Sequence, residues 1–175
     1  IIKNSPDLPN YQAMAHTFFY VSSKNGYDGA EEELNKNNLE KKDFIIFLNM
    51  ISNIYYSGTK GYNLIDKDDD KSFIFLEKSA ELGNNILQKD LCISYVSGSR
   101  GEYIFNKNYV KAYKWCYLAN LDPQIKNNNR SQKVFNKLKS LMTKEQIIEG
   151  EKLANEWIKN NSELTNNNSN KKPQK

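Results

Sequence analysis

The chain repeats part of its own sequence at a spacing of 40 residues. Residues 51–61, ISNIYYSGTKG, return as residues 91–101, LCISYVSGSRG, and Lys71 returns as Lys111. Self-similarity at a fixed period of roughly 20 to 50 residues is typical of helical-repeat proteins, in which each unit buries its apolar face against its neighbours. The repetition therefore predicts a stack of similar units, an architecture that presents surfaces for binding more often than a catalytic centre.

Apolar residues recur three and four positions apart through most of the chain, which predicts about eight helices and no convincing strand. In the first of them, Met14, Phe18 and Val21 share one face. Thr143 and Gln146 have the spacing of a capping box, which predicts that a helix starts there. The expected helices cover residues 11–22, 30–39, 43–56, 70–82, 86–97, 109–121 and 130–141, followed by the helix that Thr143 caps.

The fold class is therefore all-α, and we expect a single helical-repeat domain over residues 11–161. Residues 1–10 form an irregular lead-in, and residues 162–175, rich in Asn, Ser and Lys, are expected to be disordered. Within the domain we expect a degenerate first pair at 11–40, repeats at 42–83 and 84–123, and C-terminal capping helices at 127–161.

The repeated residues resemble the motif of the Sel-like repeat (SLR) family, relatives of tetratricopeptide repeats with longer, glycine-marked loops. In the first unit the motif positions are Ile51, Ser52, Tyr55, Gly58, Gly61, Lys71, Ser72, Phe75, Leu76, Ala80 and Gly83. In the second unit they are Leu91, Cys92, Tyr95, Gly98, Gly101, Lys111, Ala112, Trp115, Leu118 and Ala119. Ser52 and Cys92 occupy a position where the family has glycine, and Pro123 occupies the position of the glycine that closes the motif. The resemblance implies an α/α solenoid of helix-turn-helix repeats that winds as a right-handed superhelix.

Cys92 and Cys116 are the only cysteines. In the repeat frame they lie on the two antiparallel helices of one pair. They form either one disulfide in an oxidising compartment or two buried thiols in a reducing one. The sequence begins at Ile1 without a methionine, which fits a removed signal peptide as well as trimming. We expect an exported protein, periplasmic or secreted, and the cytoplasm stays open as the alternative.

The net charge of +4 argues against nucleic acid as a partner, because residues 162–175 carry +2 and leave only +2 on the rest of the chain. No apolar run approaches the roughly 18 residues of a membrane-spanning helix. We therefore expect a protein partner and a chain that is monomeric on its own.

Three constellations suggest chemistry, and each has a simpler interpretation. Residues 66–70 and Glu77 place carboxylates as in a calcium-binding loop, but Lys71 replaces the glycine that such a loop needs. Ser57 and Lys60 match Ser-x-x-Lys of penicillin-recognising enzymes, although the partner motifs are absent. His16 is the single histidine and has no nucleophile or metal-ligand set around it in the sequence, so we assign it a structural or surface role. We expect no enzyme, no metal and no cofactor.

The candidate binding surface is the face formed by the first helix of each repeat and the loop that follows, which is concave in such solenoids. Exposed tyrosine and arginine are favoured anchors at protein interfaces. The alternative is that these aromatic residues are half-buried between repeats. The candidate residues are Asn53, Tyr56, Lys60, Tyr62, Ser94, Arg100 and Tyr103.

The resemblance also implies a range of functions, all of them based on protein binding. The family includes secreted bacterial factors, signalling adaptors and periplasmic immunity proteins that neutralise secreted phospholipase toxins. Our first hypothesis is a bacterial immunity protein of the last kind. The alternatives are an exported adaptor or virulence factor that binds host or envelope proteins, and a penicillin-type hydrolase.

Overall fold

The computed structural model describes residues 10–36, 38–59 and 64–162. Over these ranges the chain contains nine helices and one pair of two-residue strands. The chain divides into two compact units, Ile1–Leu82 and Gly83–Lys175, where the sequence predicted one continuous domain. The division falls within one residue of the predicted end of the first repeat, and each unit has its own set of packed helices.

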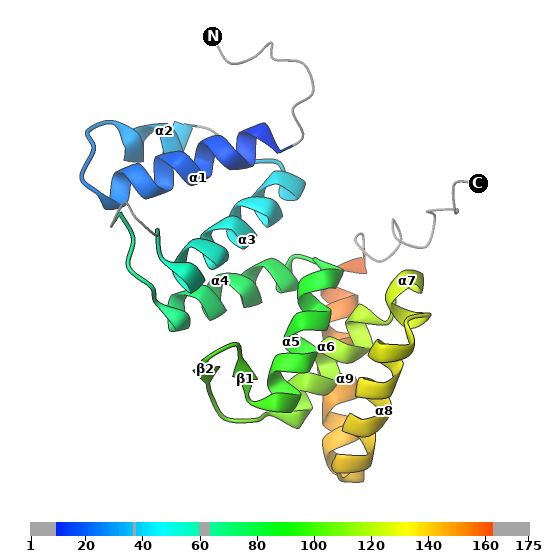
Figure 1. Ribbon diagram of the computed structural model, residues 1–175. Helices are drawn as coiled ribbons and strands as arrows, with labels where there is room; N and C mark the ends of the chain where they lie inside the picture. Colours follow the sequence, from blue (N-terminus) through cyan, green and yellow to red (C-terminus); the bar gives the residue numbers. More distant parts are fainter. Residues whose placement is uncertain (1–9, 37, 60–63, 163–175) are drawn as a thin grey trace. The chain divides into compact units, whose positions relative to one another are not determined.

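The first unit consists of two pairs of helices (Figure 1). They are α1 (Tyr11–Lys24), α2 (Ala30–Lys36), α3 (Lys41–Ser57) and α4 (Asp69–Glu81). Helix α3 packs against α4 and α1, and α1 packs against α2. The core is built from Ala13, Phe47, Leu48, Ile51, Tyr55 and Ile65.

The second unit is centred on α6, which packs against α5, α8 and α9 (Figure 1). Its helices are α5 (Asn85–Ser97), α6 (Tyr109–Ala119), α7 (Pro123–Lys126), α8 (Asn129–Leu141) and α9 (Lys144–Asn160). The two strands, β1 (Ser99–Arg100) and β2 (Tyr103–Ile104), lie between α5 and α6 and pair antiparallel. Trp115 and Leu138 are buried in this unit, at 2% and 0% exposure.

The 40-residue repetition is present in the atomic contacts as well as in the sequence. In the first repeat the Tyr55 carbonyl accepts a 2.8 Å hydrogen bond from the Asp68 N–H, and the Asp68 side chain caps α4 by accepting from the Lys71 N–H. The Lys71 ammonium lies 5.3 Å from the centre of the Tyr55 ring. The residues 40 positions later make the same three kinds of contact, and they are Tyr95, Asn108 and Lys111.

Small residues bring the two helices of each pair close together. Ser52 of α3 and Ser72 of α4 are fully buried, and the Ser52 hydroxyl donates to the Ser72 carbonyl at 2.8 Å. In the second repeat Cys92 of α5 and Cys116 of α6 are joined by a disulfide, with their Cα atoms 4.9 Å apart. Of the two alternatives that the sequence left open, the structure contains the bridge. Gly98 closes α5 at φ 74°, where an added Cβ would lie 2.9 Å from the Phe105 carbonyl oxygen.

Thr143 and Gln146 form the predicted capping box at the start of α9. Helix α7 was not predicted. Pro123 starts this helix instead of only closing the repeat, because its fixed φ suits a first helical position and the Asp122 side chain accepts from the Gln124 N–H. The short strands were also unexpected, since a two-residue pair carries no alternation for a sequence pattern to reveal.

The predicted apolar face of the first helix is wrong in detail. Met14 and Phe18 are 55% and 68% exposed, whereas Ala13 and His16 are buried. The small Ala13 side chain allows α1 to approach the core, against which Tyr20 and Val21 of the same helix also pack. The assignment of His16 to a structural or surface role agrees with this placement, in which its Nδ1 lies 3.2 Å from the Gln12 carbonyl oxygen.

Candidate functional site

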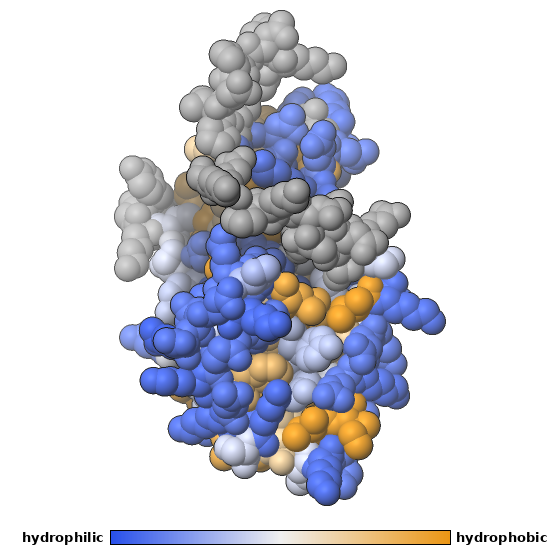
Figure 2. All heavy atoms as spheres, turned by 90° about the vertical axis from the view of Figure 1, so that its right-hand side faces the viewer, coloured by the Kyte–Doolittle hydropathy of each residue, from blue (hydrophilic) through white to orange (hydrophobic). Residues whose placement is uncertain are grey.

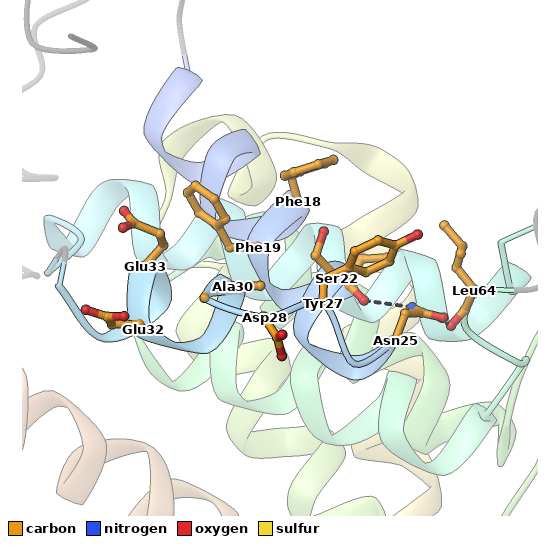
Figure 3. Close-up of a pocket in the computed structure, with 12 residues that line it drawn as sticks. Phe18, Phe19, Ser22, Asn25, Tyr27, Asp28, Ala30, Glu32, Glu33 and Leu64 are labelled. Carbon is orange, nitrogen blue, oxygen red and sulfur yellow. Dashed lines mark hydrogen bonds between the residues drawn. The ribbon is translucent and has the colours of Figure 1, made fainter.

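A groove of about 580 Å³ lies in the first unit (Figure 3). The last turns of α1 form one side, α2 forms the other, and the turn over residues 25–29 closes one end. The lining includes three aromatic and three acidic residues, Phe18, Phe19, Tyr27, Asp28, Glu32 and Glu33. The groove therefore belongs to the first helix pair, which lacks the 40-residue motif.

The turn beside the groove is held by hydrogen bonds from one asparagine. The Asn25 N–H donates to the Ser22 carbonyl at 3.0 Å and ends α1. The Asn25 side-chain amide donates to the Val21 carbonyl at 2.7 Å and to the Leu64 carbonyl at 3.0 Å. This amide thus ties the end of α1 to the segment that follows α3, and the groove has a fixed end wall.

The walls of the groove are aromatic and open to solvent. Phe18 is 68% exposed and Tyr27 is 66% exposed. The rings of Phe18 and Phe19 meet edge to face with centroids 6.0 Å apart. Adjacent large apolar side chains on the surface of a soluble protein commonly mark an interaction site. Their rigid rings also lose little conformational entropy on binding.

The rim of the groove is acidic. Asp28, Glu32 and Glu33 contribute carboxylates, and the Lys36 ammonium lies 2.8 Å from Glu32 Oε1 and 3.2 Å from Glu33 Oε1. The hydrogen bond from Lys36 holds the pKa of the Glu32 carboxyl below its usual range, so that carboxyl is ionised at neutral pH. Residues 24–36 carry four carboxylates against two lysines, in a chain with a net charge of +4. The rim therefore favours cationic groups on a partner.

The structure divides the sequence-predicted binding residues between the two units. Asn53 and Tyr56 are exposed on α3, while Arg100 and Tyr103 face each other as partners across the short strand pair. Ser94 is only 5% exposed, so its assignment to a binding surface is wrong, since α5 turns this side toward its own unit. Lys60 and Tyr62 lie outside the described residues.

The constellations that suggested metal or hydrolase chemistry have structural roles. Asp68 caps α4, and the hydrogen bond from the Lys71 N–H lowers the pKa of its carboxyl. Among the residues that the structure describes, no three His, Cys, Asp or Glu side chains gather to hold a metal ion. The Ser57 hydroxyl donates to the Asn53 carbonyl at 2.9 Å within the last turn of α3.

Sequence reasoning missed the groove because Phe18 was assigned to the core. One signal was present: Tyr27 and Asp28 lead into three consecutive glutamates, while the helix they start has few apolar residues. Tyr27 and Asp28 fall in the connection between the predicted helices 11–22 and 30–39, and a tyrosine beside an acidic run also fits the edge of a binding groove.

No protein-family profile matches the chain, and no curated protein sequence matches it. A crystal structure of c5321, a protective antigen present in uropathogenic Escherichia coli strains that displays an SLR fold, superposes with a TM-score of 0.55 at 18% identity. The match covers 93% of this chain and 33% of that one, so this chain spans about a third of that protein's length. The likeness confirms the predicted fold class, an all-α array of SLR-type helical repeats. None of the helices in the described ranges has the length and apolar character to span a membrane.

Proposed function

We propose that this chain is a non-catalytic protein-binding module whose partner docks in the groove between α1 and α2. The observation that carries the proposal is the pair of exposed aromatic side chains, Phe18 and Tyr27, beside a groove of about 580 Å³. Tyrosine and other aromatic residues are common anchors of protein interfaces. A groove with its end wall fixed by hydrogen bonds lowers the ordering cost of association.

The finer proposal is that the partner is a secreted phospholipase-type toxin, which the chain binds and neutralises as a bacterial immunity protein. Support comes from the resemblance to the SLR motif, whose family includes such proteins, and from the SLR fold. The disulfide between Cys92 and Cys116 supports export, because such bridges persist mainly in oxidising compartments. We therefore propose a periplasmic or secreted location.

The second candidate is an exported adaptor that binds host or envelope proteins. One observation favours it specifically: the structural neighbour c5321 is described as a protective antigen present in uropathogenic strains. An antigen meets host molecules, so an adaptor role for this chain is the natural alternative within the same class of binding proteins.

The experiment compares two variants of the full chain. Phe18→Ala/Tyr27→Ala removes the anchors of the groove, and Met14→Ala/Ile86→Ala removes two other exposed apolar residues that do not line it. Each of the two anchors is expected to contribute roughly 2 kcal/mol, so the groove variant should bind the partner about 700-fold more weakly. The control variant should retain the affinity of the unmodified chain.

The partner is first captured from envelope and secreted fractions, and its affinity for each variant is then measured by calorimetry. Protection is tested by exporting the captured protein in bacteria with and without this chain. Growth restored by the chain and by the control variant, but not by the groove variant, supports the immunity function. An envelope partner supports the adaptor. Equal affinity of both variants would refute the groove as the binding site.

A further inference from the structure

Basic residues concentrate on one segment of the second unit. Between residues 126 and 144 the chain has six cationic side chains and no carboxylate, although its whole net charge is only +4. All six are exposed. They are Lys126, Arg130, Lys133, Lys137, Lys139 and Lys144. We call this set the basic stripe.

Three members of the stripe share one face of α8. Arg130, Lys133 and Lys137 are spaced three and four residues apart, which places them one above another on a helix. The other side of the helix is anchored in the unit by Phe135 and Leu138, which are 8% and 0% exposed. In Figure 2 the face that includes α7 and α8 is broadly hydrophilic, with small separate hydrophobic patches. Arg130, Lys133 and Lys137 thus form a row that points away from the unit, whereas the Lys139 ammonium lies 4.2 Å from the centre of the Phe135 ring.

No acidic residue of the described chain forms an ion pair with any member of the stripe. Helix stability explains only part of these charges, since Lys126 and Lys139 lie in the last turns of α7 and α8, where positive charge is favoured. The first turn of α8 contains Arg130 and no acidic residue, although a helix N-terminus favours negative charge. Six like charges along one segment repel each other. This repulsion lowers the stability of the isolated unit, and an anionic partner would relieve the repulsion.

Two exposed aliphatic side chains lie near one end of the stripe. Leu141, the last residue of α8, is 47% exposed, and Ile148 in the second turn of α9 is 65% exposed. Only Met142 and Thr143 separate the two helices. A row of cations with neighbouring exposed aliphatic groups has the chemistry of a surface that rests on lipid headgroups and inserts a few apolar side chains below them.

We propose that the basic stripe docks the second unit on an anionic lipid surface, with Leu141 and Ile148 entering the headgroup region. Five of the six cations are lysines, and lysine is depleted in the buried centre of protein interfaces, which argues against an acidic protein as the occupant. Nucleic acid is disfavoured because the stripe has no exposed aromatic ring on which a base could stack, Phe135 being buried. A peripheral contact of this kind is independent of the groove in the first unit.

The test measures co-sedimentation of the full chain with vesicles of phosphatidylcholine, alone or mixed with phosphatidylglycerol. Each lysine near an anionic surface contributes about a fivefold gain in partitioning, so Lys126→Gln/Lys133→Gln/Lys137→Gln should bind about a hundredfold more weakly. The matched control is a triple glutamine variant at three exposed lysines outside the stripe, Lys41, Lys42 and Lys159. It has the same net charge and should bind almost as well as the unmodified chain.

Salt and apolar substitutions separate the two parts of the proposal. Binding of the unmodified chain to the mixed vesicles should fall steeply at high salt. At any one salt concentration, the Leu141→Ser/Ile148→Ser variant should bind more weakly than the unmodified chain, and its binding should depend on salt in the same way. Circular dichroism and the melting temperature verify that each variant is folded. The proposal is overturned by equal loss in the control variant, by equal binding to pure phosphatidylcholine vesicles, or by no binding to either. It is also overturned if duplex DNA or polyglutamate binds the chain more tightly than the mixed vesicles do.

Discussion

Gly150 of α9 lies directly against Tyr113 of α6, and replacing it with alanine should destabilise the second unit. A Cβ at Gly150 would lie 2.8 Å from Tyr113 Cβ and 2.9 Å from Tyr113 Cδ1. The ring has little freedom to retreat. Tyr113 is 2% exposed, its hydroxyl donates to Glu151 Oε1 at 2.8 Å, and Phe135 meets the ring 5.2 Å away.

Two opposing effects set the magnitude of this substitution. Alanine is favoured over glycine inside a helix by about 1 kcal/mol. Forcing an extra methyl group into a packed core costs roughly 1 to 3 kcal/mol. Because Tyr113 is held at both its Cβ and its hydroxyl end, we expect a cost near the upper limit, and a net loss of about 1 to 2 kcal/mol for Gly150→Ala.

The assay is urea unfolding, with tryptophan fluorescence as the recorded signal. The only tryptophans, Trp115 and Trp157, are both in the second unit, so the signal reports on that unit. The control is Asn155→Ala at an exposed position of α9, which gains helix propensity without a clash and should be slightly stabilising. With Tyr113→Gly present, which removes both the ring and the Cβ that the new methyl group would meet, Gly150→Ala should also become stabilising. A Gly150→Ala variant as stable as the Asn155→Ala variant would refute the close-packing argument.

Three further predictions concern the second unit. Reducing the Cys92–Cys116 bridge, which spans 24 residues, should cost about 3 kcal/mol of unfolding free energy in urea, and a loss below about 1 kcal/mol would contradict the entropic argument. Tyr95→Ala should cost about 3 kcal/mol or more, since the ring is 5% exposed and packs edge-on to Phe105, and a change below about 0.5 kcal/mol would be inconsistent with a core role. Burial raises the pKa of the Asp90 carboxyl, so its ionised form opposes folding at neutral pH. Asp90→Asn should therefore stabilise the protein at neutral pH and bring no gain below the unfolded pKa of about 3.9, as checked by urea unfolding at both pH values.

The sequence predicted the repeating part of the fold well because the repetition reports the same physical contacts twice. Tyr55 and Tyr95 are buried as expected, at 6% and 5% exposure, and the helices that carry them end within one residue of the predicted positions. When a motif occurs twice, the helix assignment of one copy supports that of the other. Helix α7 appears once and spans four residues, too short for a periodic pattern to reveal.

The candidate site was less predictable, because burial depends on which neighbour a helix face meets. Phe18 and Ala13 are both apolar residues of α1, and the sequence alone favours the larger one as core. The structure reverses this, since the close approach of α1 to the core selects the smaller side chain. The prediction for Ser94 was wrong in the opposite direction. This small polar residue was assigned to the surface, although tight helix packing buries it.

Both proposed surfaces lie where the 40-residue repetition is broken. The groove belongs to the first helix pair, which lacks the motif, and the basic stripe begins just beyond Pro123, which replaces the motif's closing glycine. Within the repeats, the contacts of Tyr55 and Tyr95 constrain each helix pair, so substitutions there should mainly lower stability. Outside them, Phe18 and Lys133 are exposed, and substitutions should change binding while leaving unfolding free energy within about 0.5 kcal/mol. A chain in which stability and binding separate in this way can change its partner without rebuilding its core.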